Sequence, residues 1–229
     1  MVNKKKELFN FFRVISKYNI GDLTANHASV LSNDKKGYYI NKHKYLFSQV
    51  TSDNLVYVKL DDTFSKKYNE VNKAGFYIHK YLHLSKSKPV AILHTHTVNG
   101  VAISCLKSGF NEKLNQSSMR FYKKVKYFNY SGMVVDKNEG KKLQKIASED
   151  IKLIILKNHG VIILGSSIDE LFHLNYHFEK CAEIQLKIND NKLNKVSNKI
   201  CELTSSQHSG FGKVGALSWA ATKKKFNLK

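Results

Sequence analysis

The sequence predicts an α/β fold in which helices pack against a largely antiparallel or mixed sheet. Short apolar stretches rich in β-branched residues are interspersed with segments whose apolar residues recur at helical spacing, without the strict alternation of a parallel sheet. Hydrophobic residues make up 42% of the 229 residues, which is enough for a sizeable core. No repeat or linker-like tract divides the chain, so we expect a single domain over residues 1–229.

The first half of the chain contains two predicted helices and three predicted strands. Apolar residues at helical spacing over 8–15 predict a helix that faces the core. Polar turns separate short strands predicted at 37–42 and 55–60. The apolar residues of 71–85 again follow a helical rhythm, and the only proline of the chain ends that segment. The β-branched run that follows, residues 90–98, predicts a buried strand.

The second half opens with helices predicted at 112–126 and, from a weaker pattern, at 138–148. Two apolar strands, 153–156 and 161–164, then flank a short turn and predict a β-hairpin. We expect Gly160 to supply a positive φ in this turn, because glycine adopts that conformation without steric cost.

A long helix and a polar tail complete the chain. Ser167 and Glu170 form a capping box, which predicts the start of a helix that continues through Leu186. The last roughly 30 residues are polar, so we expect them to be loosely structured, with Trp219 as an apolar anchor.

The chain is strongly basic, with 38 Lys and Arg against 18 Asp and Glu and a net charge of +20. Only two of these cations are arginines, which make the bidentate contacts typical of nucleic-acid recognition. No nucleic-acid-binding motif accompanies the charge. We therefore interpret it as a lysine-rich surface and expect no specific nucleic-acid partner. The alternative, nucleic-acid binding, predicts steeply salt-dependent retention on DNA.

The sequence also indicates a compartment. No stretch reaches the ~18–20 unbroken apolar residues of a membrane span, and the N-terminal segment lacks the pattern of a signal peptide. The three cysteines lie far apart, which argues against a disulfide framework and fits a reducing environment. We expect a cytoplasmic protein.

Three histidines predict a metal site. His94 and His96 lie two residues apart in a predicted strand, where alternation places both imidazoles on one face. His159 occupies the hairpin turn, where packing does not require a histidine. Three neutral imidazoles with an open position describe a catalytic site for a divalent metal, most often zinc. Hydrogen-bonded structural histidines are the alternative, because spacing alone does not bring His159 to the other two.

A resemblance to a known family supports the metal hypothesis. The segments 92–97 (ILHTHT) and 156–160 (LKNHG) are similar to the class II aldolase/adducin family. Four further segments resemble the adducin-like branch of this family in particular: 72–79 (NKAGFYIH), 125–132 (VKYFNYSG), 179–186 (EKCAEIQL) and 215–219 (GALSW). The likeness covers residues from about 8 to about 222, with short basic ends outside it.

The resemblance implies a three-layer α/β/α domain with a central, mostly antiparallel sheet, often assembled as a homotetramer. In the family's enzymes, the histidines matching His94, His96 and His159 bind Zn²⁺ or another divalent ion. The metal chelates the oxygens of a small hydroxy-carbonyl, sugar-like substrate and stabilises an enediolate. The expected function is therefore that of a metal-dependent lyase or isomerase.

The sequence departs from the family pattern at one important place. The sugar-phosphate aldolases carry a glutamate, both metal ligand and general acid/base, where this chain has Gly75. His79 follows one helical turn later and is our candidate for the catalytic residue, as base or fourth ligand. Without this glutamate, the sequence is compatible both with a catalytic and with a non-catalytic function. The alternative is a non-catalytic, adducin-like module that binds a protein, with an actin-type partner suggested only by analogy.

Overall fold

The computed structural model describes residues 3–188, 193–210 and 214–228. Its centre is a seven-stranded sheet with the order β3-β2-β1-β4-β7-β6-β5. The strands are β1 (His27–Leu31), β2 (Gly37–Asn41), β3 (Leu55–Lys59), β4 (Ala91–Thr95), β5 (Val125–Phe128), β6 (Leu153–Leu156) and β7 (Gly160–Gly165). Neighbouring strands are antiparallel except for the parallel pair β5 and β6. The predicted mostly antiparallel sheet is confirmed.

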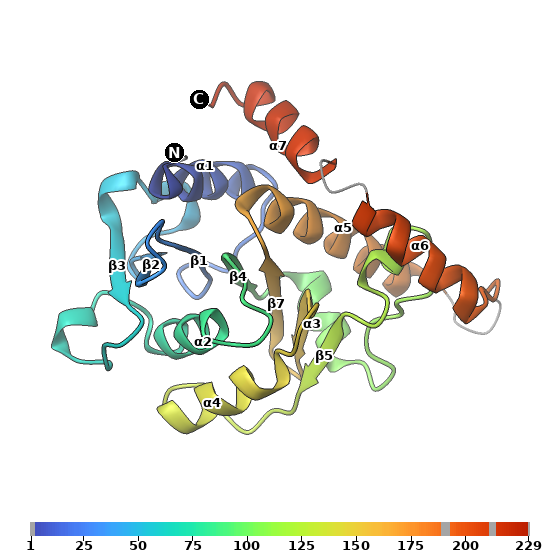
Figure 1. Ribbon diagram of the computed structural model, residues 1–229, viewed down its shortest axis with the longest axis horizontal. Helices are drawn as coiled ribbons and strands as arrows, with labels where there is room; N and C mark the ends of the chain where they lie inside the picture. Colours follow the sequence, from blue (N-terminus) through green and yellow to red (C-terminus); the bar gives the residue numbers. More distant parts are fainter. Residues whose placement is uncertain (1–2, 189–192, 211–213, 229) are drawn as a thin grey trace.

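Helices cover both faces of this sheet, with α2 and α4 below it and α1, α5 and α7 above it in the view of Figure 1. The α-helices are α1 (Lys4–Lys17), α2 (Lys73–His83), α3 (Val98–Cys105), α4 (Lys137–Ile146), α5 (Ile168–Lys187), α6 (Asn198–Gly210) and α7 (Val214–Lys225). Four short 3₁₀ segments complete the described part: η1 (Phe47–Gln49), η2 (Ser52–Asn54), η3 (Lys66–Tyr68) and η4 (Ser118–Phe121). The three-layer α/β/α arrangement is as expected.

Alternation along the strands divides the interior into two cores. In β4, Ala91 and Leu93 pack into the core beneath α1 and α5, while Ile92 packs into the core above α2 and α4. Side chains of a strand point to opposite faces in turn, so His94 lies on the α2 side of the sheet. In β1, the same rule places His27 and Ser29 on that side. The polar residues of two adjacent strands therefore share one face.

The helix starts follow the capping chemistry in the sequence. The Ser167 side chain accepts a hydrogen bond from the backbone N–H of Glu170 at 3.2 Å, which confirms the predicted start of α5. The Glu170 carboxylate accepts from the backbone N–H of Ser166, at 2.6 Å, one residue before the position of an ideal capping box. Asn72 caps α2 by accepting from the backbone N–H of Gly75 at 3.1 Å.

The prediction of a helix at 112–126 is wrong. This segment forms only η4 and then enters β5. Asn115 and Ser118 bond each other's backbone N–H groups through their side chains, both at 3.0 Å, and such local bonds compete with helix formation. Lys123 then adopts a left-handed conformation with a φ of 61°, which redirects the chain into the strand.

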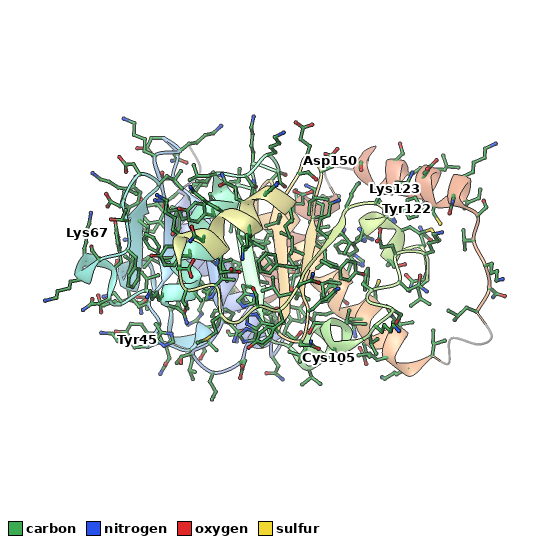
Figure 2. The ribbon with its side chains drawn as sticks, turned by 90° about the horizontal axis from the view of Figure 1, so that it is seen from below. Tyr45, Lys67, Cys105, Tyr122, Lys123 and Asp150 are labelled. Atoms are coloured by element: carbon green, nitrogen blue, oxygen red, sulfur yellow. The ribbon has the colours of Figure 1, made fainter. Side chains whose placement is uncertain are left out.

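The prediction of a loosely structured tail is also wrong, because two helices form there. The α6 helix packs over η4, and Lys123, beside Tyr122 in Figure 2, forms an ion pair with Glu202 of α6 at 2.5 Å. The expected anchor is confirmed: Trp219 of α7 is 5% exposed and its indole N–H donates to the Glu7 carboxylate at 2.8 Å. Tertiary contacts thus stabilise helices whose own sequence pattern is weak.

The hairpin of β6 and β7 is confirmed, but the residue with positive φ is Asn158, at 55°, and not Gly160. Gly160 is needed for space: a Cβ atom there would lie 2.5 Å from the carbonyl oxygen of Thr95. The missing side chain lets the turn approach the end of β4 closely.

A Gly160→Ala substitution should lower the free energy of unfolding by about 1–3 kcal/mol, because the added methyl group must displace backbone rather than a flexible side chain. Urea unfolding measures this effect. Gly210→Ala is the matched control, since a Cβ at Gly210 meets nothing within 4 Å. Equal stability of the two variants would contradict the close approach.

Within the described residues, no helix is both long enough and apolar enough to cross a bilayer. All three cysteines of the chain are free thiols, Cys105 at the surface (Figure 2) and the other two buried.

Candidate metal centre

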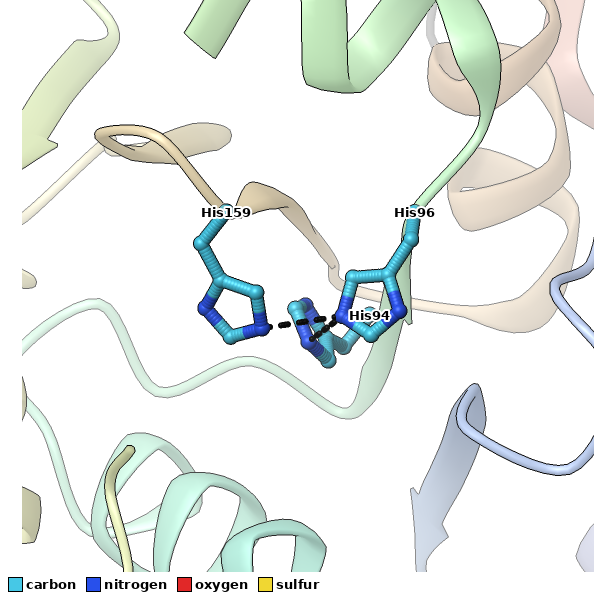
Figure 3. Close-up of side chains that lie close together, drawn as sticks. All are labelled: His94, His96 and His159. Atoms are coloured by element: carbon cyan, nitrogen blue, oxygen red, sulfur yellow. Dashed lines mark hydrogen bonds between the residues drawn. The ribbon is translucent and has the colours of Figure 1, made fainter. Parts of the chain in front are cut away.

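The structure brings the three sequence-predicted histidines together (Figure 3). His94 lies in β4, His96 follows the end of that strand, and His159 occupies the turn between β6 and β7. The Nε2 atom of His96 lies 2.9 Å from the Nε2 atoms of both His94 and His159. One ligand atom from each residue lies within 4.8 Å of the others, so the group could hold a metal ion.

Strand pairing explains why residues distant in sequence meet here. β4 and β7 are antiparallel neighbours with Thr95 opposite Val161, so the turn before β7 lies beside the end of β4. The backbone N–H of His159 donates to the Leu156 carbonyl at 3.0 Å and to the Ser104 hydroxyl at 3.2 Å. β4 ends at Thr95, before His96, so strand alternation alone does not position His96.

Hydrogen-bond acceptors behind two of the rings fix where their protons lie. The Nδ1 atom of His94 donates to the Val161 carbonyl at 2.9 Å. The Nδ1 atom of His96 faces the Asp22 carboxylate at 3.3 Å. Both partners only accept, so each neutral ring carries its proton on Nδ1 and a lone pair on Nε2. Acceptors of this kind behind metal-binding histidines orient the rings and raise their basicity as ligands.

Burial keeps all three imidazoles neutral at pH 7. Burial, and then the nearby histidines, hold the pKa of His94 well below its usual value. The same two causes lower the pKa of His159 to about 4. The pKa of His96 is also lowered by burial, although Asp22 opposes the shift. Neutral imidazole is the form that binds metals.

The arrangement fits a divalent cation. The Nε2 lone pairs of His94 and His96 face each other at 2.9 Å, where no hydrogen bond can form between two acceptors. A cation between them removes this repulsion. Both nitrogens are close enough to each other to be ligands of one ion, which would bind them at ~2.0–2.1 Å if it were zinc. Imidazole donors suit zinc, iron, nickel and copper.

A pocket of about 750 Å³ opens next to this group, and its wall includes all three histidines. The rest of the described lining carries two lysines, Lys66 and Lys73, and no aspartate or glutamate. Among the residues that the structure places here, therefore, no carboxylate is available for proton transfer.

His27 also lines the pocket, although it was not predicted from the sequence as a site residue. It begins β1 opposite His94, and its ring centroid lies 4.9 Å from that of His94. Its imidazole fills the space in front of Gly75, where a Cβ atom would lie 3.0 Å from the His27 ring. The alternation of His27 and Ser29 with Ala28 and Val30 is the signal that could have revealed β1 and this side chain.

His79 occupies a different place from the three histidines. It is fully buried on α2, and its Nε2 atom lies 2.7 Å from Nδ1 of His27. It is not among the residues that line the pocket, because His27 lies between it and His94. The catalytic role of His79 stays a prediction, and any effect on the pocket would pass through His27.

Comparison with known proteins now identifies the fold. The family model described as the class II aldolase and adducin N-terminal domain matches residues 6–186. An adducin-related protein of Schizosaccharomyces pombe is 30% identical over 91% of this chain and 69% of its own length. The chain belongs to the class II aldolase/adducin family. A putative aldolase class 2 protein of Pseudomonas aeruginosa is 29% identical over 76% of this chain and 67% of its own length.

Adducins belong to the same set of relatives. Rat alpha-adducin is 29% identical over 79% of this chain, but this match spans only 25% of the adducin. Among solved structures, an aldolase II superfamily protein from Pseudomonas syringae has a TM-score of 0.86 and 26% identity, covering 97% of this chain and 91% of its own. An L-fuculose 1-phosphate aldolase from Glaciozyma antarctica has a TM-score of 0.77 at 21% identity, covering 96% and 88%, and shows the shared fold.

Proposed function

We propose that this member of the family is a divalent-metal-dependent lyase or isomerase that acts on a small hydroxy-carbonyl, sugar-like compound. The single observation that carries the proposal is the pair of facing lone pairs on His94 and His96 at 2.9 Å. Such an arrangement is unfavourable unless a cation lies between the rings. His159 completes a set of three neutral imidazoles at the wall of a pocket large enough for a sugar-sized molecule.

Bound to these imidazoles, Zn²⁺ or a similar ion would supply Lewis-acid stabilisation of the negative charge that develops on a carbonyl oxygen. The protein residues supply the rest. Val161 and Asp22 keep the rings in the ligating tautomer. Lys66 and Lys73, with no carboxylate in the described lining, favour a substrate with an anionic group.

Two exposed apolar side chains lie near the site. Leu23 is 79% exposed next to Asp22, and Val98 is 86% exposed next to Thr97. We propose that the protein assembles as a homotetramer, as the family resemblance implies, and that Leu23 and Val98 lie in its contacts. The free thiols of the three cysteines support a cytoplasmic location.

The enzymatic proposal is tested by metal content and by exchange of carbon-bound protons. The protein, dialysed against micromolar Zn²⁺, should retain one ion per chain, measured by elemental analysis. In D₂O it should then exchange the proton next to the carbonyl of at least one compound in a panel of hydroxy-carbonyl acids and sugar phosphates, detected by NMR. Chelated protein is the control. Absence of a bound ion would overturn the proposal.

A non-catalytic, adducin-like binding module is the second candidate. Gly75 and the absence of a carboxylate from the described pocket lining favour it, as does the similarity to the adducins. If the protein is such a module, it should co-sediment with actin filaments at moderate salt. This co-sedimentation should persist after metals have been chelated. Filament binding without any proton exchange would support this candidate over the first.

A further inference from the structure

A line of buried hydrogen bonds runs from the pocket into the layer between β1 and α2. It connects His27 Nδ1 to His79 Nε2 at 2.7 Å, His79 Nδ1 to Ser29 Oγ at 2.5 Å, Ser29 Oγ to His83 Nε2 at 2.8 Å, and His83 Nδ1 to the Pro89 carbonyl at 2.9 Å. The four side chains are at most 6% exposed. The metal-site geometry described above does not use this chain of bonds.

The Pro89 carbonyl sets the direction of every bond in this line. A carbonyl only accepts, so His83 donates from Nδ1 and, as a neutral ring, accepts at Nε2. The Ser29 hydroxyl donates its one proton to Nε2 of His83, so its oxygen accepts a hydrogen bond from Nδ1 of His79. The Nε2 atom of His79 is then an acceptor, and His27 donates to it from Nδ1.

The surroundings of the three rings keep them neutral. Burial lowers the pKa of His83 to about 4, although its bond to Pro89 opposes the shift. Burial, and then neighbouring histidines, hold the pKa values of His79 and His27 well below the usual range. The charged neighbours that lower the pKa values of His79 and His27 are all histidines, and none is a lysine or a carboxylate.

These bonds leave a lone pair on Nε2 of His27. No protein group among the described residues bonds this nitrogen, and it is not one of the enclosed polar atoms without a partner. His27 lines the pocket, so this nitrogen is the ring atom left to bond a molecule bound there. Its ring edge lies against Gly75, the position that the family resemblance matches to the glutamate of the aldolases.

We propose that His27 Nε2 is the pocket's hydrogen-bond acceptor for a substrate hydroxyl group, and that Ser29, His79 and His83 are positioning residues that fix its tautomer. The inference rests on the proposed function and specifies its substrate class, a compound with a hydroxyl next to the metal-binding group. A hydroxyl that donates its proton to His27 keeps its oxygen lone pairs for a cation bound at the three imidazoles. A neutral acceptor on β1 thus lies beside Gly75 of α2.

The tautomer can be measured without a substrate. Full-length protein with ¹⁵N-labelled histidine rings, metal-free and zinc-loaded, should give one His27 species in long-range ¹H–¹⁵N spectra, protonated on Nδ1. The assignment comes from the signal that a His27→Ala variant loses. In Ser29→Ala the bond that orients His79 is gone, and the Nε2-protonated species of His27 should appear. Wild-type His27 protonated on Nε2 would overturn the inference.

Binding provides the second readout, with glycolate and acetate as probes that differ by one hydroxyl. The ratio of their affinities for the zinc-loaded protein, measured by calorimetry, should fall about three- to tenfold in His27→Ala, the value of one hydrogen bond. His43→Ala is the matched control, since His43 lines the same pocket outside this line of bonds. An unchanged ratio in His27→Ala, with zinc still bound at one ion per chain, would overturn the inference while leaving the metal site intact. Loss of zinc from the wild type would instead count against the proposed function.

Discussion

Replacing His159 with alanine should abolish stoichiometric binding of a divalent metal and, with it, any activity. His159 supplies one of three ligands, and two imidazoles without a third rarely hold zinc at micromolar concentrations. The variant should still fold, because the turn is held by bonds to the backbone N–H of His159 and not to its ring. Metal that binds only the folded state at about 100 times its Kd adds about 2.7 kcal/mol to the free energy of unfolding. We expect this increment in the wild type and not in His159→Ala.

A graded series makes this prediction specific. Asp22→Ala removes the acceptor behind His96 and should weaken metal binding by about 10- to 100-fold without abolishing it. His43→Ala should leave metal affinity unchanged, since its ring lies in the pocket but outside the group of three. Urea unfolding with and without Zn²⁺ measures all three variants. Full metal-dependent stabilisation of His159→Ala would contradict the ligand assignment.

Acidification should destabilise the metal-free protein steeply below pH 6.5. The pKa of His83 is about 4 in the folded protein against 6.5 in the unfolded chain, so below 6.5 the unfolded state binds a proton that the folded state excludes. The free energy of unfolding therefore falls as the pH falls, at about 1.4 kcal/mol per pH unit for one such group. By about pH 5, His83 alone accounts for roughly 2 kcal/mol.

The other buried histidines add to this effect. The pKa values of His27, His79 and His94 are all held well below their usual range, mainly by burial. Each of these residues therefore also lowers the free energy of unfolding as the pH falls. Stabilities of single domains are typically about 5–15 kcal/mol, so the protein should unfold before the pH reaches about 4. Urea titrations at several pH values test this, and His83→Leu should show about one proton fewer taken up on unfolding. A flat stability profile between pH 7 and 5 would contradict the buried network.

Much of the fold was accessible from the sequence because periodicity reports burial directly. The hairpin of β6 and β7 and the long α5 helix both follow from uninterrupted apolar patterns and a capping serine. The errors at 112–126 and in the tail have a common cause. Asn115 and Ser118 divert their segment through local side-chain bonds, and α7 depends on the contacts of Trp219, so neither outcome is visible in the period of apolar residues.

The candidate site was predictable in its composition but not in its connections. The spacing of His94 and His96, and the unusual place of His159, identified the three imidazoles. Which ring nitrogen faces inward depends on Val161 and Asp22, residues without any motif. His27 was overlooked because β1 is short and polar on one face. Its neighbour across the helix–sheet interface, His79, was predicted as a site residue from its place one helical turn after Gly75.

The packing of α7 on α1 has a consequence for synthesis of the protein. Trp219 and Glu7, joined by a hydrogen bond, are 212 residues apart in the chain. Because a ribosome releases the chain from its amino end, α1 emerges long before the helix that covers Phe11. The part of the α1 surface that Trp219 covers therefore stays uncovered until α7 has been synthesised. We expect this part of α1 to become protected against proteases only after α7 has packed on it.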